Sequence, residues 1–392
     1  MIVMIEIGLV GVPSSGKSTF FKAATLKDVK IASYPFTTIE PNEGLAYISA
    51  KCPCKELGLS CSSCIGGIRF IPVKLWDVAG LVPGAHLGRG HGNAFLDDIM
   101  QASALIHVLD VSGGIDSDGN PTDNFDPAKN IQMLEEEITY WLLGIFKKDI
   151  HAYQKNPEKF SEIFLKRFSG LGITKQHLDT TLSLSGLTAK ELLGFEDENL
   201  FRFIDKIRQL SKPIIIAANK IDLSSAKNNF IRLKKRFSEK IIIPTSAECE
   251  LALREASAKQ IIDYLPGAAS FKIKSENITE QQREALEFLK NFLIKNGTTG
   301  VQDCLNKIVF DLLDMIVVYP VEDENKFARK DGKVLPDALL VKRGTTAREL
   351  AYKIHQEIGD KFIAAIDART KQQVSADYVL KNNDIISIRS GR

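Results

Sequence analysis

The sequence predicts an α/β fold: a mostly parallel sheet interrupted by a helical insertion and followed by a small α+β module. Three observations predict it. Short apolar runs at 5–10, 70–75, 104–109, 212–218 and 241–243 are typical of strands buried in a parallel sheet. After residue 130, apolar residues recur at three- and four-residue steps, as in amphipathic helices. Beyond residue 315, strand-like runs flank one helical stretch, which indicates a separate module.

The length of the chain predicts several domains, since its 392 residues exceed the roughly 250–300 at which a single core stops growing. We expect a sheet domain made of 1–120 and 211–270, with a cysteine-rich insert at 52–64. A helical insertion should occupy 121–210, a helical linker 271–314, and the small module 315–392. Residues 251–314 as a whole are expected to be helical.

Composition limits the classes of function. Hydrophobic residues make up 44% of the chain and charged residues 26%, and no apolar run reaches the roughly 18 residues of a membrane span, so we expect no membrane partner. The apolar start, Met1 to Ile7, lacks the basic lead and cleavage site of a signal peptide. We therefore expect a cytoplasmic protein. A net charge of +2 neither requires nor excludes a nucleic-acid partner.

The first strand runs into a glycine-rich loop that precedes a helical stretch. The loop and its continuation read Gly11-Val12-Pro13-Ser14-Ser15-Gly16-Lys17-Ser18-Thr19, which is the P-loop pattern in its strand, loop and helix context. Backbone N–H groups of such a loop cradle phosphates, Lys17 reaches the β- and γ-phosphates, and the Ser18 hydroxyl binds Mg²⁺. We expect Lys17 to be catalytic and to contact the nucleotide. The other predicted contacts in this loop are Gly11, Pro13, Ser14, Ser15, Gly16, Ser18 and Thr19. The alternative is a chance glycine-rich turn.

A second element closes the strand at 70–75 with Trp76-Asp77-Val78-Ala79-Gly80. An acidic residue at the carboxyl end of a strand opposite a P-loop can hold Mg²⁺ through water, so Asp77 is a predicted metal ligand. Gly80 is expected to offer its N–H to the γ-phosphate. Without the P-loop, such an Asp before Gly would indicate only a turn.

A third element, Asn219-Lys220-Ile221-Asp222, follows the strand at 212–218. A carboxylate can accept hydrogen bonds from the N1–H and the 2-amino group of guanine, a donor pair that adenine lacks. Asp222 therefore predicts GTP as substrate and GDP as product. Asn219 should tie this loop to the P-loop, and the Lys220 stem should cover a face of the base. Ser246 and Ala247 follow the next strand and should approach the purine. A surface turn is the competing interpretation.

Four of the six cysteines, Cys52, Cys54, Cys61 and Cys64, form a C-x-C and a C-x₂-C pair separated by six residues. Four thiolates on a short loop can surround one tetrahedral Zn²⁺, and Gly58 would let the loop double back. We expect structural zinc, with disulfides and free thiols as alternatives. Catalytic zinc is not expected, because no histidine or open position accompanies the cluster.

Two long sequence motifs resemble those of a known protein family. The first is Tyr34-Pro35-Phe36-Thr37-Thr38-Ile39-Glu40-Pro41-Asn42. The second runs from Val78 through Leu81 to His86 and continues from Gly88 to Leu96. Together with the nucleotide motifs they resemble the Obg-HflX superfamily, most closely the YchF (Obg-like) family in its archaeal form, over the whole chain. The resemblance implies a P-loop NTPase of the TRAFAC GTPase class with an α-helical insertion and a C-terminal ubiquitin-like β-grasp (TGS) domain.

The resemblance also implies roles for single residues. Thr38 matches the family's switch I ligand to Mg²⁺. Leu81 stands where Ras-like proteins carry a catalytic Gln, and a leucine cannot orient water. His86 matches a switch II histidine suggested to act in its place, although a solvated loop histidine is an equal alternative. Ser14 departs from the Asn that many members carry for potassium, so potassium activation is left open.

The resemblance implies partners as well. TGS domains are associated with ribosome and RNA contacts, so we expect the ribosome, rRNA or tRNA as a partner and a role in translation or ribosome assembly. Many YchF members read Asn-x-x-Glu and prefer ATP, whereas this chain retains Asp222. The alternatives are an Obg-like ATPase and a nucleotide-gated adaptor that binds RNA or the ribosome. We expect a monomer.

Overall fold

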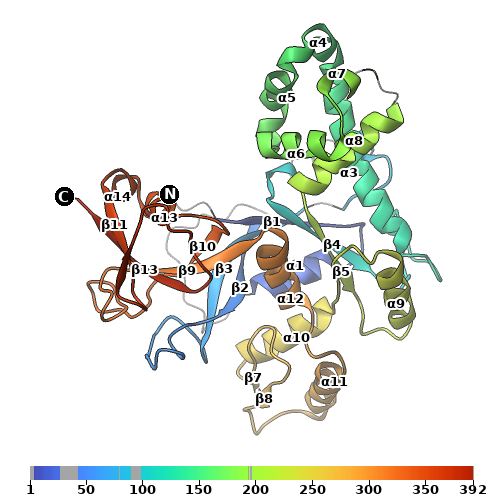
Figure 1. Cartoon of the computed structure of the whole chain (residues 1–392). Coiled ribbons are helices and arrows are strands. Elements are labelled where there is room, and N and C mark those ends of the chain that lie inside the picture. The colour runs from blue at the N-terminus through green and yellow to red at the C-terminus, as the bar shows by residue number, and fades with distance from the viewer. Residues whose placement is uncertain are drawn as a thin grey trace.

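The computed structural model describes residues 4–26, 43–78, 80–89, 99–192, 194 and 197–391. A central sheet with helices on both faces forms the body of the molecule (Figure 1). The helical insertion projects from one side of this body (green), and the C-terminal module lies against another (red).

The central sheet has six strands in the order β2-β3-β1-β4-β5-β6. All neighbours are parallel except β2 and β3, which pair antiparallel from Glu43↔Trp76 to Lys51↔Ile68. The strands are β1 (Glu6–Val10), β2 (Glu43–Lys51), β3 (Ile68–Asp77), β4 (Ala104–Asp110), β5 (Ile214–Asn219) and β6 (Ile242–Pro244). Since the parallel strands share one direction, the P-loop, Asp77, the Asn219 loop and Ser246 all follow strand ends at one edge of the sheet.

Helices cover both faces of the sheet, which explains why its central strands are apolar throughout. On one face, Ile7 and Leu9 of β1 cluster with Phe20 of α1 (Lys17–Thr25), Ala247 of α10 (Ala247–Ala258) and Leu305 of α12 (Val301–Lys307). On the other face, the core includes residues of α3 (Ala128–Lys148), α8 (Asp197–Ser211) and α9 (Ala226–Arg236).

The helical insertion is held together by aromatic packing. Five of its buried rings, Phe146, Tyr153, Phe160, Phe164 and Phe168, lie within one core cluster. Phe164 and Phe168 stack with ring centroids 4.2 Å apart. Between α3 and α8 lie α4 (Ile150–Lys155), η2 (Pro157–Lys159), α5 (Phe160–Phe168), η3 (Ser169–Leu171), α6 (Lys175–Ser185) and α7 (Ala189–Leu192).

The segment after the sheet differs from the prediction of helix throughout 251–314. A short hairpin of β7 (Ile262–Asp263) and β8 (Lys272–Ile273) lies within it, so a domain boundary between 270 and 271 would divide this hairpin. Two-residue strands are too short to show a periodicity in the sequence. The hairpin is followed by α11 (Glu280–Asn296), α12 and a π-helical turn, η4 (Ile308–Leu312). Cys304 of α12 and Val309 of η4 lie in the core of the sheet, so this stretch belongs to the body of the molecule.

The C-terminal module is a five-stranded sheet in the order β10-β9-β13-β11-β12, with a parallel β9–β13 pair at its centre. Its elements are β9 (Met315–Val321), β10 (Leu339–Lys342), α13 (Ala347–Ile354), α14 (Gln356–Asp360), β11 (Phe362–Asp367), β12 (Gln372–Val374) and β13 (Asp384–Ser390). A capping box between Thr346 and Glu349 begins α13. Leu350 of α13 packs on Ile316 and Ile386, so the helix covers one face of this sheet.

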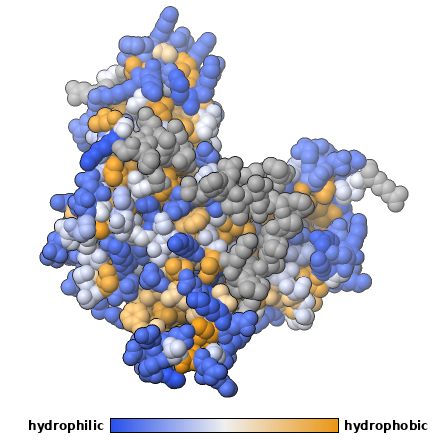
Figure 2. Space-filling view, turned by 180° about the vertical axis from the view of Figure 1, so that it is seen from behind, coloured by the Kyte–Doolittle hydropathy of each residue, from blue (hydrophilic) through white to orange (hydrophobic). Residues whose placement is uncertain are grey.

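In the part of the chain that the structure describes, no helix combines the length and the hydrophobicity of a membrane span. Hydrophilic side chains dominate the rim of the face seen in Figure 2.

Candidate nucleotide site

The P-loop takes a backbone path that requires glycine at two positions. Gly11 has φ +149° and Gly16 has φ +97°. A Cβ at Gly11 would lie 2.4 Å from the Val108 carbonyl oxygen, and one at Gly16 would lie 2.3 Å from the Asn219 amide nitrogen. Both contacts are below the distance that real Cβ atoms show, so side chains are excluded where the loop must turn.

Lys17 begins α1 and folds back over the loop. Its Nζ donates to the carbonyl oxygens of Gly11 at 3.1 Å and Val12 at 3.0 Å. Burial lowers the pKa of Lys17 to about 8, and the nearby Asp77 carboxylate opposes this shift. A largely buried ammonium bonded only to neutral carbonyls can exchange these partners for phosphate oxygens.

The two described residues predicted to bind Mg²⁺ meet at the mouth of the P-loop. Ser18 Oγ donates to Asp77 Oδ2 at 3.0 Å, across the gap between α1 and β3. A hydroxyl and a carboxylate are the hard oxygen ligands that Mg²⁺ prefers, so this donor set fits the ion. Thr38, the third predicted ligand, lies outside the described residues.

Gly80 lies against the P-loop. A Cβ at this position would be 2.9 Å from Pro13 Cγ, and the next residue, Leu81, donates its N–H to the Gly11 carbonyl at 3.0 Å. Leu81 is buried, with 1% of its surface exposed. The start of the loop after β3 is therefore fastened to the phosphate-binding loop.

Asn219 joins three motifs with one side chain. Its Nδ2 donates to the Ser15 carbonyl at 2.9 Å, and its Oδ1 accepts from the Ala247 N–H at 3.0 Å. Ser246 caps α10 by accepting from the Cys249 N–H at 3.2 Å. Asp222 follows Asn219 on the same loop and is partly exposed.

The sequence interpretation missed Asp110 at the end of β4. Its buried carboxylate accepts from Lys220 Nζ at 2.7 Å and from the Ser112 N–H at 2.9 Å. This ion pair holds the side chain of Lys220, a residue of the base-recognition loop, against the end of β4. The available signal was an acidic residue at the carboxyl end of an apolar strand, the feature that identified Asp77.

The loop after β4 was also missed as part of the site. Gly119, with φ +84°, passes so close to the P-loop that a Cβ would lie 2.7 Å from Pro13 Cβ. Asp116 shapes this turn by accepting from the N–H groups of Asp118 and Asn120, each at 2.9 Å. The turn formers at 113–121 therefore make a wall of the site.

His86 is held by α3. Its Nδ1 lies 2.6 Å from Glu137 Oε2, its backbone N–H donates to the same carboxylate at 3.0 Å, and its ring stacks on Tyr140 with centroids 5.0 Å apart. The Gly84 N–H also donates to Glu137, at 2.6 Å. The loop after β3 is thus attached to the helical insertion, and the catalytic role of His86 stays a prediction.

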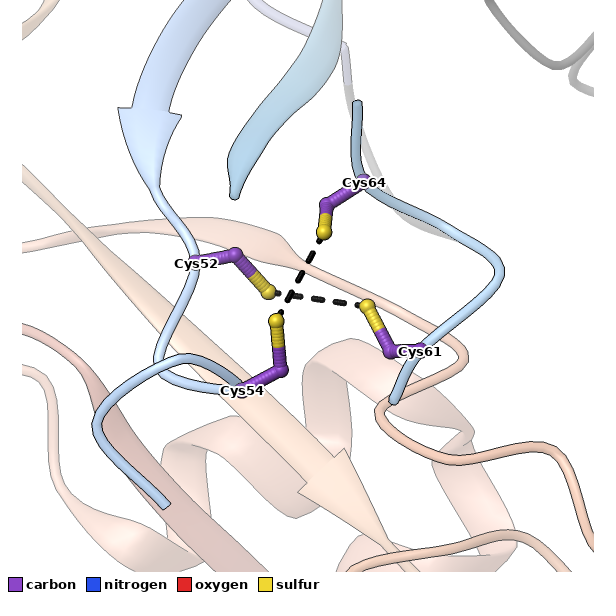
Figure 3. Close-up of side chains that lie close together, drawn as sticks. All are labelled: Cys52, Cys54, Cys61 and Cys64. Carbon is purple, nitrogen blue, oxygen red and sulfur yellow. Dashed lines mark hydrogen bonds between the residues drawn. The ribbon is translucent and has the colours of Figure 1, made fainter. Parts of the chain in front are cut away.

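The four clustered cysteines converge at the tip of the β2–β3 hairpin (Figure 3). Their sulfur atoms all lie within 4.8 Å of one another. Cys52 and Cys61 are 3.8 Å apart, Cys54 and Cys64 are 3.5 Å apart, and the two lines joining these pairs cross in the view. Zn–S bonds of about 2.3 Å at tetrahedral angles place sulfur atoms about 3.8 Å apart. The crossed pairs therefore match opposite edges of a ZnS₄ tetrahedron.

Three family models match successive parts of the chain. Residues 6–146 match the model described as 50S ribosome-binding GTPase. Residues 217–323 match the Obg-like GTPase YGR210-like, G4 motif-containing domain. Residues 327–390 match the TGS domain.

Relatives extend this match to the full length. The uncharacterized GTP-binding protein MJ1332 of Methanocaldococcus jannaschii is 53% identical over 99% of both chains. The crystal structure of a GTP-binding protein from Pyrococcus horikoshii OT3 has a TM-score of 0.78 and 37% identity, covering 99% of this chain and 100% of that one. The ribosome-binding ATPase YchF of Mycoplasma genitalium is 29% identical over 66% of this chain and 68% of its own length.

The motifs, the geometry and the full-length relatives agree on a GTP-binding protein that hydrolyses GTP. The chain belongs to the YchF (Obg-like) family of P-loop GTPases, with a C-terminal TGS domain.

Proposed function

We propose that this GTPase is a Mg²⁺-dependent switch that acts on the ribosome, in translation or in ribosome assembly. The dependence on Mg²⁺ is supported by the hydrogen-bonded Ser18–Asp77 pair, which lies at the mouth of the P-loop next to Lys17. Mg²⁺ bound there would neutralise charge on the β- and γ-phosphates. Ser18 and Thr38 would bind the ion directly, and Asp77 would hold it through water.

Titration of GTP hydrolysis with Mg²⁺ tests this assignment. Ser18→Ala should raise the Mg²⁺ concentration needed for half-maximal rate by roughly tenfold or more, because it removes a direct oxygen ligand. Thr25→Ala removes a hydroxyl from the other end of α1, where it bonds the Phe21 carbonyl, and should behave as wild type. Equal Mg²⁺ requirements for wild type and Ser18→Ala would contradict the metal site.

The ribosome is proposed for three reasons: the match to the 50S ribosome-binding GTPase model, the TGS domain, and the similarity to the ribosome-binding ATPase YchF of Mycoplasma genitalium. In the TGS domain, Lys342 and Lys381 are exposed. Arg343 and Arg389 are instead engaged by Asp314 and Glu324, each at 2.7 Å. The two exposed lysines are therefore the better candidates for contacts with RNA phosphates. This role would place the protein in the cytoplasm.

Co-sedimentation with ribosomal subunits, in a GTP analogue and in GDP, tests the partner. We expect binding in the analogue, release in GDP, and weaker binding of Lys342→Glu/Lys381→Glu. Lys272→Glu/Lys274→Glu, with the same charge change on exposed residues of the β7–β8 hairpin region, is the matched control. Absence of the protein from ribosomal fractions in both nucleotides would contradict the proposal. Binding unaffected by Lys17→Ala would favour a nucleotide-independent adaptor. A monomer is expected in the ribosome-free fractions.

We also propose that Cys52, Cys54, Cys61 and Cys64 hold one structural Zn²⁺. The sulfur geometry supports zinc, since the four sulfur atoms converge and the Cys52–Cys61 and Cys54–Cys64 distances match tetrahedral edges. Protein purified under reducing, anaerobic conditions should contain one zinc per chain by elemental analysis, and Cys61→Ser/Cys64→Ser should contain none. Metal-free wild type that takes up no added zinc would contradict the site.

A further inference from the structure

We infer that the tetracysteine loop, residues 52–67, is the joint that fixes the TGS domain on the nucleotide-binding sheet. The inference rests on the proposed structural zinc and adds a role for it: the metal holds the loop in the shape on which the TGS domain docks.

The loop lies at the end of the β2–β3 hairpin remote from the nucleotide. The hairpin pairs Glu43 with Trp76 at the nucleotide edge and Lys51 with Ile68 at the loop. Nine paired residues at about 3.3 Å each separate the two ends by roughly 25–30 Å. Zinc here is therefore too far from the phosphates to take part in hydrolysis, which leaves a structural role.

The loop contributes to a core that the two domains share. Cys52 and Cys54, each 3% exposed, belong to the same buried cluster as Tyr319 of β9 and Ile385 of β13. Leu57 and Leu59 pack against this cluster from the loop, beside other partly buried side chains. The face of the TGS sheet opposite α13 is thus covered in part by the cysteine loop.

Polar contacts span the same junction. Arg369 Nη2 of the TGS domain lies 3.3 Å from Glu56 Oε2 of the loop. Beside the loop, the buried Arg69 of β3 donates to the carbonyl oxygens of Leu335 and Pro336, and its guanidinium lies 5.7 Å from the centre of the Tyr319 ring. The cysteine loop and the start of β3 that follows it therefore both contact the TGS domain.

The loop has little regular structure of its own. Its backbone is closed by the Cys52 N–H to the Gly67 carbonyl at 2.8 Å, the Leu59 N–H to the Cys54 carbonyl at 2.8 Å, and an isolated bridge between Ile65 and Ile68. One metal bound by four side chains would cross-link both arms of the loop, and metal binding of this kind is coupled to folding. Loss of zinc should loosen the surface on which β9 and β13 rest.

Hydrogen–deuterium exchange of the full chain tests the joint, with zinc content and affinity for a fluorescent GDP analogue measured on the same samples. Removal of zinc from wild type by a chelator should speed amide exchange in β9 and β13 by roughly tenfold or more, as expected for local opening, and readdition of zinc should reverse it. The affinity for GDP should change less than about twofold, since the nucleotide edge is remote. Cys61→Ser/Cys64→Ser should behave like stripped wild type, and Ser62→Ala/Ser63→Ala, which removes no ligand, like loaded wild type.

Leu59→Ser provides a variant that keeps all four cysteines. It should retain one zinc and still exchange faster in β9, because it removes an apolar contact with the shared core. If wild type stripped of zinc exchanges its β9 and β13 amides as slowly as the zinc-bound protein, the proposed role of the loop as a joint is wrong, whereas the zinc site itself is not contradicted. Protein that never binds zinc would overturn both. Slow exchange in β9 of Leu59→Ser would also count against the joint, even if the cysteine variant fails to fold.

Discussion

Lys17, the lysine of the P-loop, carries its charge in a largely buried position, which disfavours the charged form in the nucleotide-free protein. Lys17 is buried, and burial lowers its pKa to about 8 against the opposing effect of Asp77. Its present partners are two carbonyl oxygens. A triphosphate would favour the charged form, so nucleotide binding should raise the pKa of Lys17 again.

This predicts proton uptake on binding. Between about pH 8 and the ordinary lysine pKa near 10.4, the free protein has largely lost this proton and the complex regains it, so affinity for GDP should fall as pH rises through that window. Calorimetry at pH 8.5 in two buffers of different ionisation enthalpy measures the proton directly. Lys17→Arg keeps its charge throughout the window and should show less uptake. Equal uptake by wild type and Lys17→Arg would contradict the assignment.

His86 allows a second prediction at the same scale. If its imidazole positions the attacking water, His86→Ala should lower kcat by roughly 10²-fold or more and leave the affinity for GTP unchanged. His151→Ala, an exposed histidine of the helical insertion, is the control. A kcat for His86→Ala within about twofold of wild type would assign this histidine to structure alone, through its bond to Glu137.

Helix α1 is held at both ends. Its N-terminus carries Lys17 and Ser18, and its C-terminal carbonyls are capped by the buried Arg254 of α10. The guanidinium donates to the Ala23 carbonyl at 3.1 Å and to that of Leu26. The orientation of the helix that presents the metal ligand therefore depends on a residue far along the chain.

Arg254→Met should destabilise the protein through this cap. Two carbonyls would lose their donor, at about 1–3 kcal/mol for each buried unsatisfied group, and Glu250 would lose its nearby cation. Urea unfolding followed by circular dichroism should show a fall of several kcal/mol. Arg283→Met, which breaks an exposed pair with Glu280, should cost well under about 1 kcal/mol. Equal losses in the two variants would contradict the capping role.

Elements with a strong local signal could be predicted from the sequence, and those made by distant contacts could not. Apolar runs followed by fixed polar residues predict three of these elements: the P-loop, the strand ending in Asp77 and the strand before Asn219. The β7–β8 hairpin has two-residue strands and no periodicity, so the sequence predicts helix there instead. The Lys220–Asp110 pair, the attachment of His86 to Glu137 and the Arg254 cap join residues more than 50 positions apart, which no local pattern reveals.

The GTPase sheet and the TGS domain share one hydrophobic core. Strand β3 carries Asp77 at one end, and its other end follows the cysteine loop, while Arg69 near that end bonds the TGS domain. On the opposite face, the loop after β3 is attached to α3 of the helical insertion. The TGS domain and the helical insertion therefore both contact elements that lead directly to the nucleotide site.

Selection of guanine by the Asp222 carboxylate, on the loop after β5, can be measured by a competition titration of GTP, ATP and XTP. Wild type should prefer GTP. Asp222→Asn should lose roughly hundredfold or more in GTP affinity, since two charge-assisted hydrogen bonds are removed, and should gain affinity for XTP, whose 2-carbonyl can accept from the new amide. Glu255→Gln, an exposed carboxylate of α10, should leave the order unchanged. Equal binding of ATP and GTP by wild type, or undiminished GTP binding by Asp222→Asn, would show that Asp222 does not select guanine.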